Sequence, residues 1–144
     1  MNLLISEGAD INSQDEKGRS ALHFAVETFS KVNVALLKSK GANLDIKDND
    51  GRTPLHYSIS NSTTRKEIME FIISNGADIN AKDKNGWTAL HITASEGKKI
   101  LADILISHGI DINAKDHEGN SALYYASERK HHTTVKSLIS HGAN

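Results

Sequence analysis

Short apolar clusters alternate with polar segments along the whole chain, and the clusters come in pairs. The first cluster of a pair combines Leu and Ala at close spacing, as in Leu22 with Ala25 and Leu90 with Ala94. The second cluster is a longer run of Leu, Ile and Val, such as residues 100–106. Spacings of three and four residues place side chains on one face of a helix. The pattern therefore predicts pairs of short helices, each with one apolar face.

A polar turn motif, Asp-x-x-Gly, precedes the first helix of each pair. Asp can accept hydrogen bonds from the backbone just downstream, and Gly tolerates a positive φ, so the motif predicts a tight turn. Its four glycines are Gly18, Gly51, Gly86 and Gly119. A Ser or Thr two residues later predicts a helix N-cap. In one unit that residue is Thr53, and Pro54 follows at the first helical position, where its missing N–H would be unpaired anyway.

These motifs share one period. The turn glycines follow one another at intervals of 33, 35 and 33 residues. A second series of glycines, which we expect to end the second helices, follows at 33, 35, 33 and 33 residues. Self-similarity of this kind is typical of stacked repeats. The predicted units are 15–47, 48–82, 83–115 and 116–144, after a partial unit, 1–14, that holds the end of a second helix and a return strand.

The unit boundaries carry two further expectations. The unit 48–82 contains a two-residue insertion within about residues 60–66, between its helices. Both ends of the chain fall inside a repeat, so we expect a segment of a longer array whose last unit is truncated or forms a cap. The polar residues His132, Thr134 and Ser137 stand where the preceding unit has Lys99, Leu101 and Ile104. They indicate such a cap, because the end of a solenoid needs a polar outer face.

The units resemble the ankyrin repeat, whose pattern is close to D-x-x-G-x-T-P-L-H-x-A, a turn, a second helix and L-L-x-x-G-A-D-x-N. The best match is the third full unit, through Asp83, Gly86, Thr88, Leu90, His91, Ala94, Gly97, Leu105, Gly109 and Asn113. Ala replaces Pro in three units, and Tyr124 stands where the family has His. The resemblance implies an all-α repeat solenoid, a curved stack in which each unit contributes a β-hairpin turn and an antiparallel helix pair.

Composition narrows the class of protein. Hydrophobic residues make up 38% of the chain, charged residues 24%, and the formal net charge is −1. The mixture suits a folded protein rather than a disordered one, and neither sign of charge dominates, so we expect no nucleic-acid partner. The chain has no cysteine and no apolar run near 18 residues. We therefore expect a cytoplasmic monomer without membrane insertion.

Eight histidines raise the question of metal binding or catalysis. Three of them, His23, His56 and His91, recur at one repeat position, where the resemblance implies a structural role: bonding the N-cap residue and the neighbouring hairpin. A zinc site needs about four convergent ligands, and no nucleophile, phosphate-binding or dinucleotide motif occurs. We expect no enzyme, no cofactor and no metal. The sequon Asn61-Ser62-Thr63 is interpreted as a polar inter-helix loop.

The resemblance also implies the working surface, because ankyrin arrays bind proteins through hairpin tips and the adjoining ends of the first helices. Aromatic and Arg anchors carry most interface energy, which favours Arg19, Arg52, Trp87 and Arg129. The other candidates are Glu16, Lys17, Asn49, Asp50, Lys84, Asn85, His117, Glu118, Asn120, Glu27, Thr28, Ser60, Asn61, Ser95, Glu96 and Glu128, with Lys47, Lys82 and Lys115 on the approaches to the turns. Trp87 is the only Trp, and its alternative role is a ring folded onto the neighbouring hairpin.

The leading hypothesis is a non-catalytic protein–protein interaction scaffold that binds a partner protein through its hairpin tips and concave helix face. One alternative is a regulatory or targeting segment of a larger enzyme, channel or ubiquitin-ligase adaptor. Another is a pathogen effector acting on host proteins, because the excess of Lys over Arg and the many Ile and Asn residues suit AT-rich codons. Binding of nucleic acid or a small ligand, and a spring-like role, stay as further alternatives.

Overall fold

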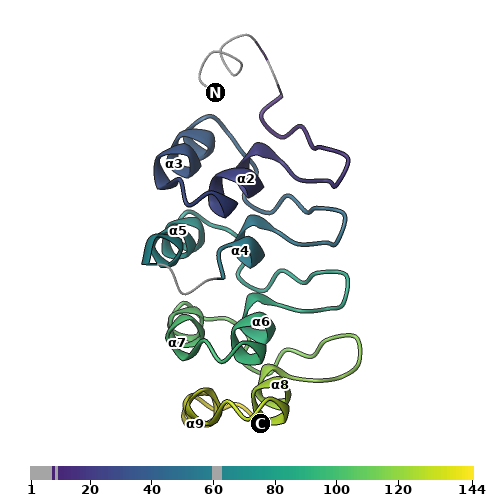
Figure 1. Ribbon diagram of the computed structural model, residues 1–144, viewed down its shortest axis with the longest axis vertical. Helices are drawn as coiled ribbons and strands as arrows, with labels where there is room; N and C mark the ends of the chain where they lie inside the picture. The colour runs from purple at the N-terminus through teal and green to yellow at the C-terminus, as the bar shows by residue number, and fades with distance from the viewer. Residues whose placement is uncertain (1–7, 9, 60–62) are drawn as a thin grey trace.

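The computed structural model describes residues 8, 10–59 and 63–144, and it shows helix pairs stacked along one axis with loops projecting to one side (Figure 1). Eight helices lie in these residues: α2 (Ala21–Glu27), α3 (Lys31–Ser39), α4 (Pro54–Tyr57), α5 (Thr63–Ser74), α6 (Ala89–Ser95), α7 (Lys99–Ser107), α8 (Ala122–Glu128) and α9 (His132–Ser140). Among them no helix has the length and apolar character needed to cross a membrane. The all-helical repeat stack confirms the predicted fold class.

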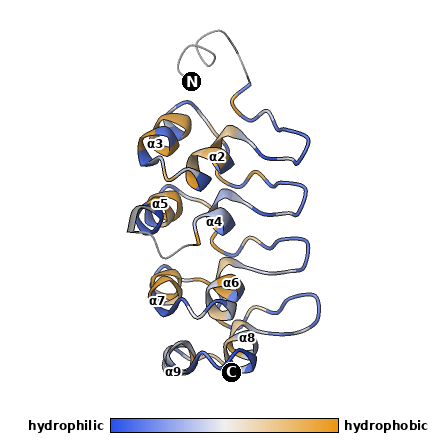
Figure 2. Cartoon of the chain, in the orientation of Figure 1, coloured by the Kyte–Doolittle hydropathy of each residue, from blue (hydrophilic) through white to orange (hydrophobic). Residues whose placement is uncertain are grey.

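The core runs between the two helix layers. The inward sides of the helices are apolar and the projecting loops are polar (Figure 2). Leu22, Leu55 and Leu90 recur in the first helices and are each 1% exposed, while Ile72 and Leu105 of the second helices are fully buried. Burial of one such side chain contributes roughly 1.5–3 kcal/mol. Because each unit packs only against its neighbours, this core has to be completed by stacking.

Replacement of Pro by Ala at the first helical position leaves three helices intact. Ala21, Ala89 and Ala122 begin α2, α6 and α8 in the place that Pro54 takes in α4. The two-residue insertion of the second unit falls partly on residues 60–62, which lie outside the described residues. The partial unit at the start lies there too, except for Gly8 and residues 10–14.

The prediction that three polar residues of α9 form an outer face is wrong for two of them. Thr134 and Ser137 are buried, and only His132 is exposed. Position 134 corresponds to the buried Leu101 one unit earlier, so a polar side chain at this place still points toward the core. The hydroxyl of Ser137 is accommodated there because it donates a hydrogen bond to the carboxylate of Asp103 on α7.

The projecting loops are hairpins that stack through their backbones. In the second hairpin, Asp48 N–H donates to the Arg52 carbonyl over 2.9 Å. Neighbouring hairpins are joined by Asn49 N–H to the Lys17 carbonyl, and by Lys84 N–H to the Asp50 carbonyl, both over 2.9 Å. Gly51 has φ +74, and a Cβ there would lie 2.8 Å from Lys84 N. Glycine is therefore required at position 51 for two reasons: the backbone has a positive φ, and the next hairpin approaches too closely for a side chain.

A ladder of side-chain amides and carboxylates ties the return segments together. Each rung is an Oδ1 atom that accepts a hydrogen bond from a backbone N–H one unit later, at 2.8–3.0 Å. The four rungs are Asn12 to Asn43, Asp45 to Asp78, Asn80 to Asp111 and Asn113 to Asn144. Two lysines add cross-links, because the ammonium groups of Lys47 and Lys82 donate to the carbonyls of Lys82 and Lys115. The register between units is thus fixed by polar bonds as well as by the core.

Among the described residues, two that are not glycine adopt the left-handed conformation in the turn between paired helices. Phe29 has φ 58 and Lys130 has φ 59, at the place where the third unit has Gly97 with φ 68. An L-residue in this conformation costs roughly 1–2 kcal/mol more than glycine does. Glycine also gains entropy in the unfolded chain, which offsets part of that difference.

We therefore expect Lys130→Gly to raise the free energy of unfolding by about 0.5–1 kcal/mol, measured by urea denaturation followed by circular dichroism. The matched control is Lys136→Gly, an exposed lysine inside α9. There glycine replaces a helical residue, so the same substitution is expected to lower stability by about 1 kcal/mol. A destabilised Lys130→Gly protein would contradict the assignment of strain to this turn.

Candidate functional site

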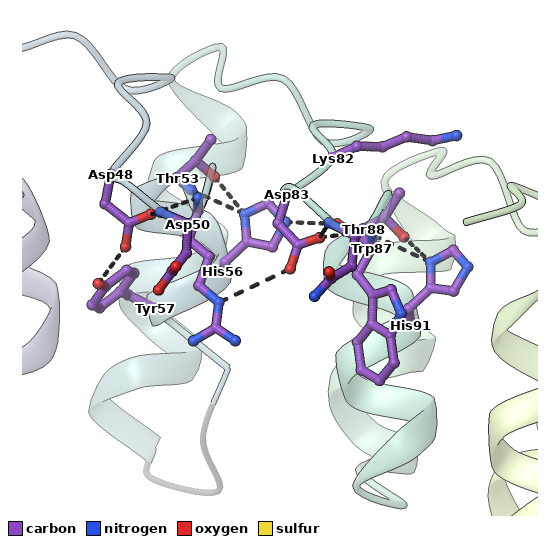
Figure 3. Close-up of polar contacts among 12 residues, drawn as sticks. Asp48, Asp50, Thr53, His56, Tyr57, Lys82, Asp83, Trp87, Thr88 and His91 are labelled. Carbon is purple, nitrogen blue, oxygen red and sulfur yellow. Dashed lines mark hydrogen bonds and ion pairs between the residues drawn. The ribbon is translucent and has the colours of Figure 1, made fainter. Parts of the chain in front are cut away.

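The base of each hairpin is held by one aspartate. In the second unit, Asp48 Oδ1 accepts hydrogen bonds from the N–H groups of Asp50 and Arg52, each over 2.8 Å. Asp48 Oδ2 accepts from the Tyr57 hydroxyl over 2.6 Å (Figure 3). Burial by itself raises the pKa of Asp48, but the hydrogen bonds outweigh it and lower the pKa. The carboxylate therefore stays ionised and fixes the hairpin against the first helix of its own unit.

The hairpins pass into the first helices through a histidine bridge that repeats three times. His56 Nδ1 lies 3.1 Å from Thr53 N and 2.9 Å from Thr53 Oγ1, and its Nε2 lies 3.0 Å from the Trp87 carbonyl (Figure 3). A carbonyl can only accept, so Nε2 carries the proton and Nδ1 accepts from the N-cap. His23 makes the same contacts to Ser20 and the Arg52 carbonyl.

His91 repeats the bridge between Thr88 and the carbonyl of Asn120. Burial is the main cause that lowers the pKa of all three imidazoles, so they are neutral in the folded protein. In the last unit the hydroxyl of Ser121 accepts from the N–H of Tyr124, whose ring is 46% exposed. The bridges position each hairpin base relative to the unit before it.

A stripe of apolar side chains lies beside the hairpin bases, and the sequence analysis missed it. It consists of the residues directly after the repeated His or Tyr, namely Phe24, Tyr57, Ile92 and Tyr125; we call it the inner stripe. All four are partly or largely exposed. Tyr57 packs edge-on against His23 of the preceding unit, with ring centroids 5.0 Å apart. The sequence does contain a signal for the inner stripe, because the position directly after the repeated His or Tyr holds a large apolar residue in every unit.

Trp87 lies at the centre of this surface. Its ring packs on Tyr125 of the next unit at a centroid distance of 4.6 Å and stacks on His91 of its own unit at 6.2 Å. The side chain is half-buried. Trp87 is thus supported by α6 and α8 and still presents part of its ring to solvent.

Two hollows flank Trp87. The first has a volume of about 410 Å³ and is lined by Glu27, Arg52, His56, Tyr57, Ile59, Trp87, Ile92 and Glu96. The second has a volume of about 340 Å³ and is lined by Asn85, Trp87, Asp116, His117, Glu118 and Tyr125. Hairpin bases and tips, the inner stripe and the helix ends meet in these hollows.

The predicted anchor residues are in different environments. Arg19 is used within its own unit, because its guanidinium pairs with Asp15 at 3.0 Å, approaches Glu27 at 3.7 Å and lies 4.3 Å over the Phe24 ring. Arg52 is half-exposed and lies 4.0 Å from Asp83. Arg129 is exposed at the end of α8.

Most other predicted residues lie where the sequence analysis expected them. Exposed side chains at the tips belong to Glu16, Lys17, Asn49, Asp50, Lys84, Asn85, His117 and Glu118, and Asn120 is half-buried. At the helix ends, Glu27, Thr28, Glu96 and Glu128 are exposed. Ser95 is the exception: it is buried, and its carbonyl accepts from His131 Nε2 over 3.0 Å. Ser60 and Asn61 lie outside the described residues.

Within the described part of the chain, no group of three His, Asp or Glu side chains is placed to hold a metal ion. The aspartates beside the hollows are fixed in turns by backbone N–H groups. The hollows present aromatic rings, carboxylates and the half-exposed guanidinium of Arg52 on a repeat scaffold.

Comparison with known proteins agrees with this description. A family model for ankyrin repeats, built of three copies, matches residues 1–83 and again residues 62–144. No curated protein matches the chain.

Proposed function

Because the chain belongs to the ankyrin-repeat family, we propose that it is a non-catalytic scaffold that binds a partner protein through its hairpin tips and inner stripe. Ankyrin repeats are generally protein–protein interaction modules, and the family is typically non-catalytic. The surface around Trp87 is our candidate for the centre of that interface.

One observation supports this location above the others: a partly exposed Trp lies between two hollows. Interface energy concentrates in a few aromatic and Arg residues that sit in pockets near the centre of the buried surface. Trp87 combines both properties, because Tyr125 and His91 pack against its ring and the residue lines both hollows. Arg52 lines the first hollow from the neighbouring hairpin. A partner that crosses the hairpins here contacts an aromatic anchor and a guanidinium together.

We expect Trp87→Ala to weaken partner binding at least about tenfold, as truncation of a central aromatic anchor does. The measurement is quantitative affinity capture from cell extract, followed by titration of the captured protein against both forms of the chain. Arg52→Ala is expected to weaken the same interaction by a smaller factor, because this side chain is half-exposed and solvent screens it.

The matched control is Ile100→Ala. Ile100 is an apolar side chain 67% exposed on α7, in the other helix layer, so its truncation also removes apolar area without touching the hollows. A partner retained by Ile100→Ala and lost with Trp87→Ala supports the proposal. Equal retention by both variants would place the interface elsewhere. Circular dichroism of each variant separates loss of binding from loss of fold.

A further inference from the structure

We infer that the hollow between the third and fourth hairpins binds an arginine side chain of the partner. We call it the fourth-hairpin hollow; its lining residues are Asn85, Trp87, Asp116, His117, Glu118 and Tyr125. The inference rests on the proposed function, because it names the chemistry that the same surface recognises.

The aromatic walls fit a planar cation. Trp87 and Tyr125 lie 4.6 Å apart between centroids with their planes at 52°, and both rings are partly exposed. A guanidinium within about 6 Å of such a ring is attracted by the ring face. Arg is preferred to Lys because its flat group can stack on a ring and bond a carboxylate at the same time.

The charged walls are negative. Asp116 Oδ1 accepts from the N–H groups of Glu118 and Asn120 at 3.0 and 2.9 Å, and Asp116 Oδ2 accepts from the Tyr125 hydroxyl at 2.5 Å. Burial alone raises the pKa of Asp116, but these bonds outweigh it and keep the carboxylate ionised. Glu118 is exposed beside it. Among the described residues that line the fourth-hairpin hollow there is no Lys or Arg.

In the first unit an arginine of the chain itself lies on the corresponding ring and carboxylate. There Arg19 lies 4.3 Å over the Phe24 ring and bonds the Asp15 carboxylate at 3.0 Å. The corresponding residues of the fourth unit are Asn120, Tyr125 and Asp116, so the ring and the carboxylate are kept while the arginine is replaced by a short amide. The Tyr125 hydroxyl bonds Asp116 Oδ2, the oxygen that Arg19 bonds on Asp15. An arginine from a partner would therefore stack on the Tyr125 and Trp87 rings and be attracted by the charges of Asp116 and Glu118.

The test uses the full chain and a displayed library of random linear peptides as the probe. Peptides whose binding is lost with Trp87→Ala are expected to be enriched in Arg. Replacing that Arg by Gln in a selected peptide is expected to weaken binding about tenfold, and by Lys about threefold. In the chain, Glu118→Gln should weaken binding about fivefold. Glu70→Gln removes the same charge on α5, in the other helix layer and away from the hairpins, so it should leave binding unchanged.

A second variant tests whether an arginine of the chain itself can compete with the partner's arginine for the fourth-hairpin hollow. Asn120→Arg introduces at this hairpin base the residue that two other units carry, so the fold should tolerate it. Its guanidinium should occupy the fourth-hairpin hollow and weaken binding of the Arg peptide at least about tenfold. Asn75→Arg adds the same charge at an exposed position after α5 and should have little effect.

Each outcome decides between the two proposals. Trp87-dependent peptides without Arg enrichment, or an Asn120→Arg protein that binds them as tightly as the unsubstituted chain, would overturn the arginine site and leave the proposed function standing. If no selected peptide depends on Trp87, both proposals fall. Arg enrichment that disappears in Asn120→Arg and persists in Asn75→Arg establishes the site.

Discussion

Replacing His91 with alanine is expected to lower the free energy of unfolding by about 3 kcal/mol. The imidazole is fully buried and joins two units, with Nδ1 near Thr88 N and Oγ1 and Nε2 3.2 Å from the Asn120 carbonyl. Alanine leaves a buried N–H and a buried carbonyl without their partner, and each such group costs roughly 1–3 kcal/mol. The vacated ring volume adds a cavity penalty.

Urea denaturation followed by circular dichroism at pH 7.5 measures this effect. The control is His132→Ala, which removes an exposed imidazole at the first residue of α9 and should change stability by less than about 0.5 kcal/mol. Equal stability of the two variants would show that the bridge between units adds nothing. A larger loss for His91→Ala establishes that the third and fourth units are coupled through this side chain.

Stability is expected to fall steeply as the pH drops below about 6.5. Burial lowers the pKa of His23, His56 and His91 from the ordinary value of 6.5, so below that pH the unfolded chain binds protons that the folded chain does not. Three such protons give a slope of up to about 4 kcal/mol per pH unit. The stabilisation is complete above pH 6.5 and is lost as the pH falls toward the folded pKa values.

The geometry gives the same sign. Nδ1 faces a backbone N–H in each bridge, so a proton added there destroys the hydrogen bond and buries a charge. The aspartates affect the stability of the fold in a separate pH range. The pKa values of Asp48, Asp103 and Asp116 are lowered from 3.8 in the folded protein, so their contribution is lost only below about pH 4.

Urea midpoints between pH 4.5 and 8 measure the histidine window. In His23→Gln one of the three titrating bridges is removed, so the slope should decrease by about a third, whatever the overall stability of the variant. A slope that is unchanged in His23→Gln, or a stability that is flat between pH 5 and 7, would contradict the assignment of buried neutral imidazoles.

The repeat, the helix pairs and the turn positions could all be predicted from the sequence. Asp48, Gly51 and Thr53 specify a turn and a helix start through bonds within a few residues, so local chemistry alone identifies them. The repeat period then predicts that the units stack, because a single helix pair of this size cannot bury its apolar face.

The candidate site was predicted only in part. The hairpin tips follow from the repeat, and most of them are exposed as expected. Ser95 was expected on the surface and is buried, since His131 of the next unit, the residue before α9, bonds its carbonyl. Thr134 and Ser137 were expected to face outward and point inward, because helix orientation is set by the whole apolar face rather than by single residues.

The sequence by itself therefore determined the fold, the register of its units and the bonds that each turn makes with itself. Only the tertiary structure decided which side chains remain available to a partner. Arg19 and Asn120 occupy the same repeat position, yet Arg19 is paired with Asp15 and Phe24, while Asn120 bonds Glu118 and the Tyr125 hydroxyl. A hollow remains between Trp87 and Tyr125. The hollow depends on a contact between two units, because Trp87 belongs to the third unit and Tyr125 to the fourth. No local pattern encodes it, because it arises when neighbouring units stack.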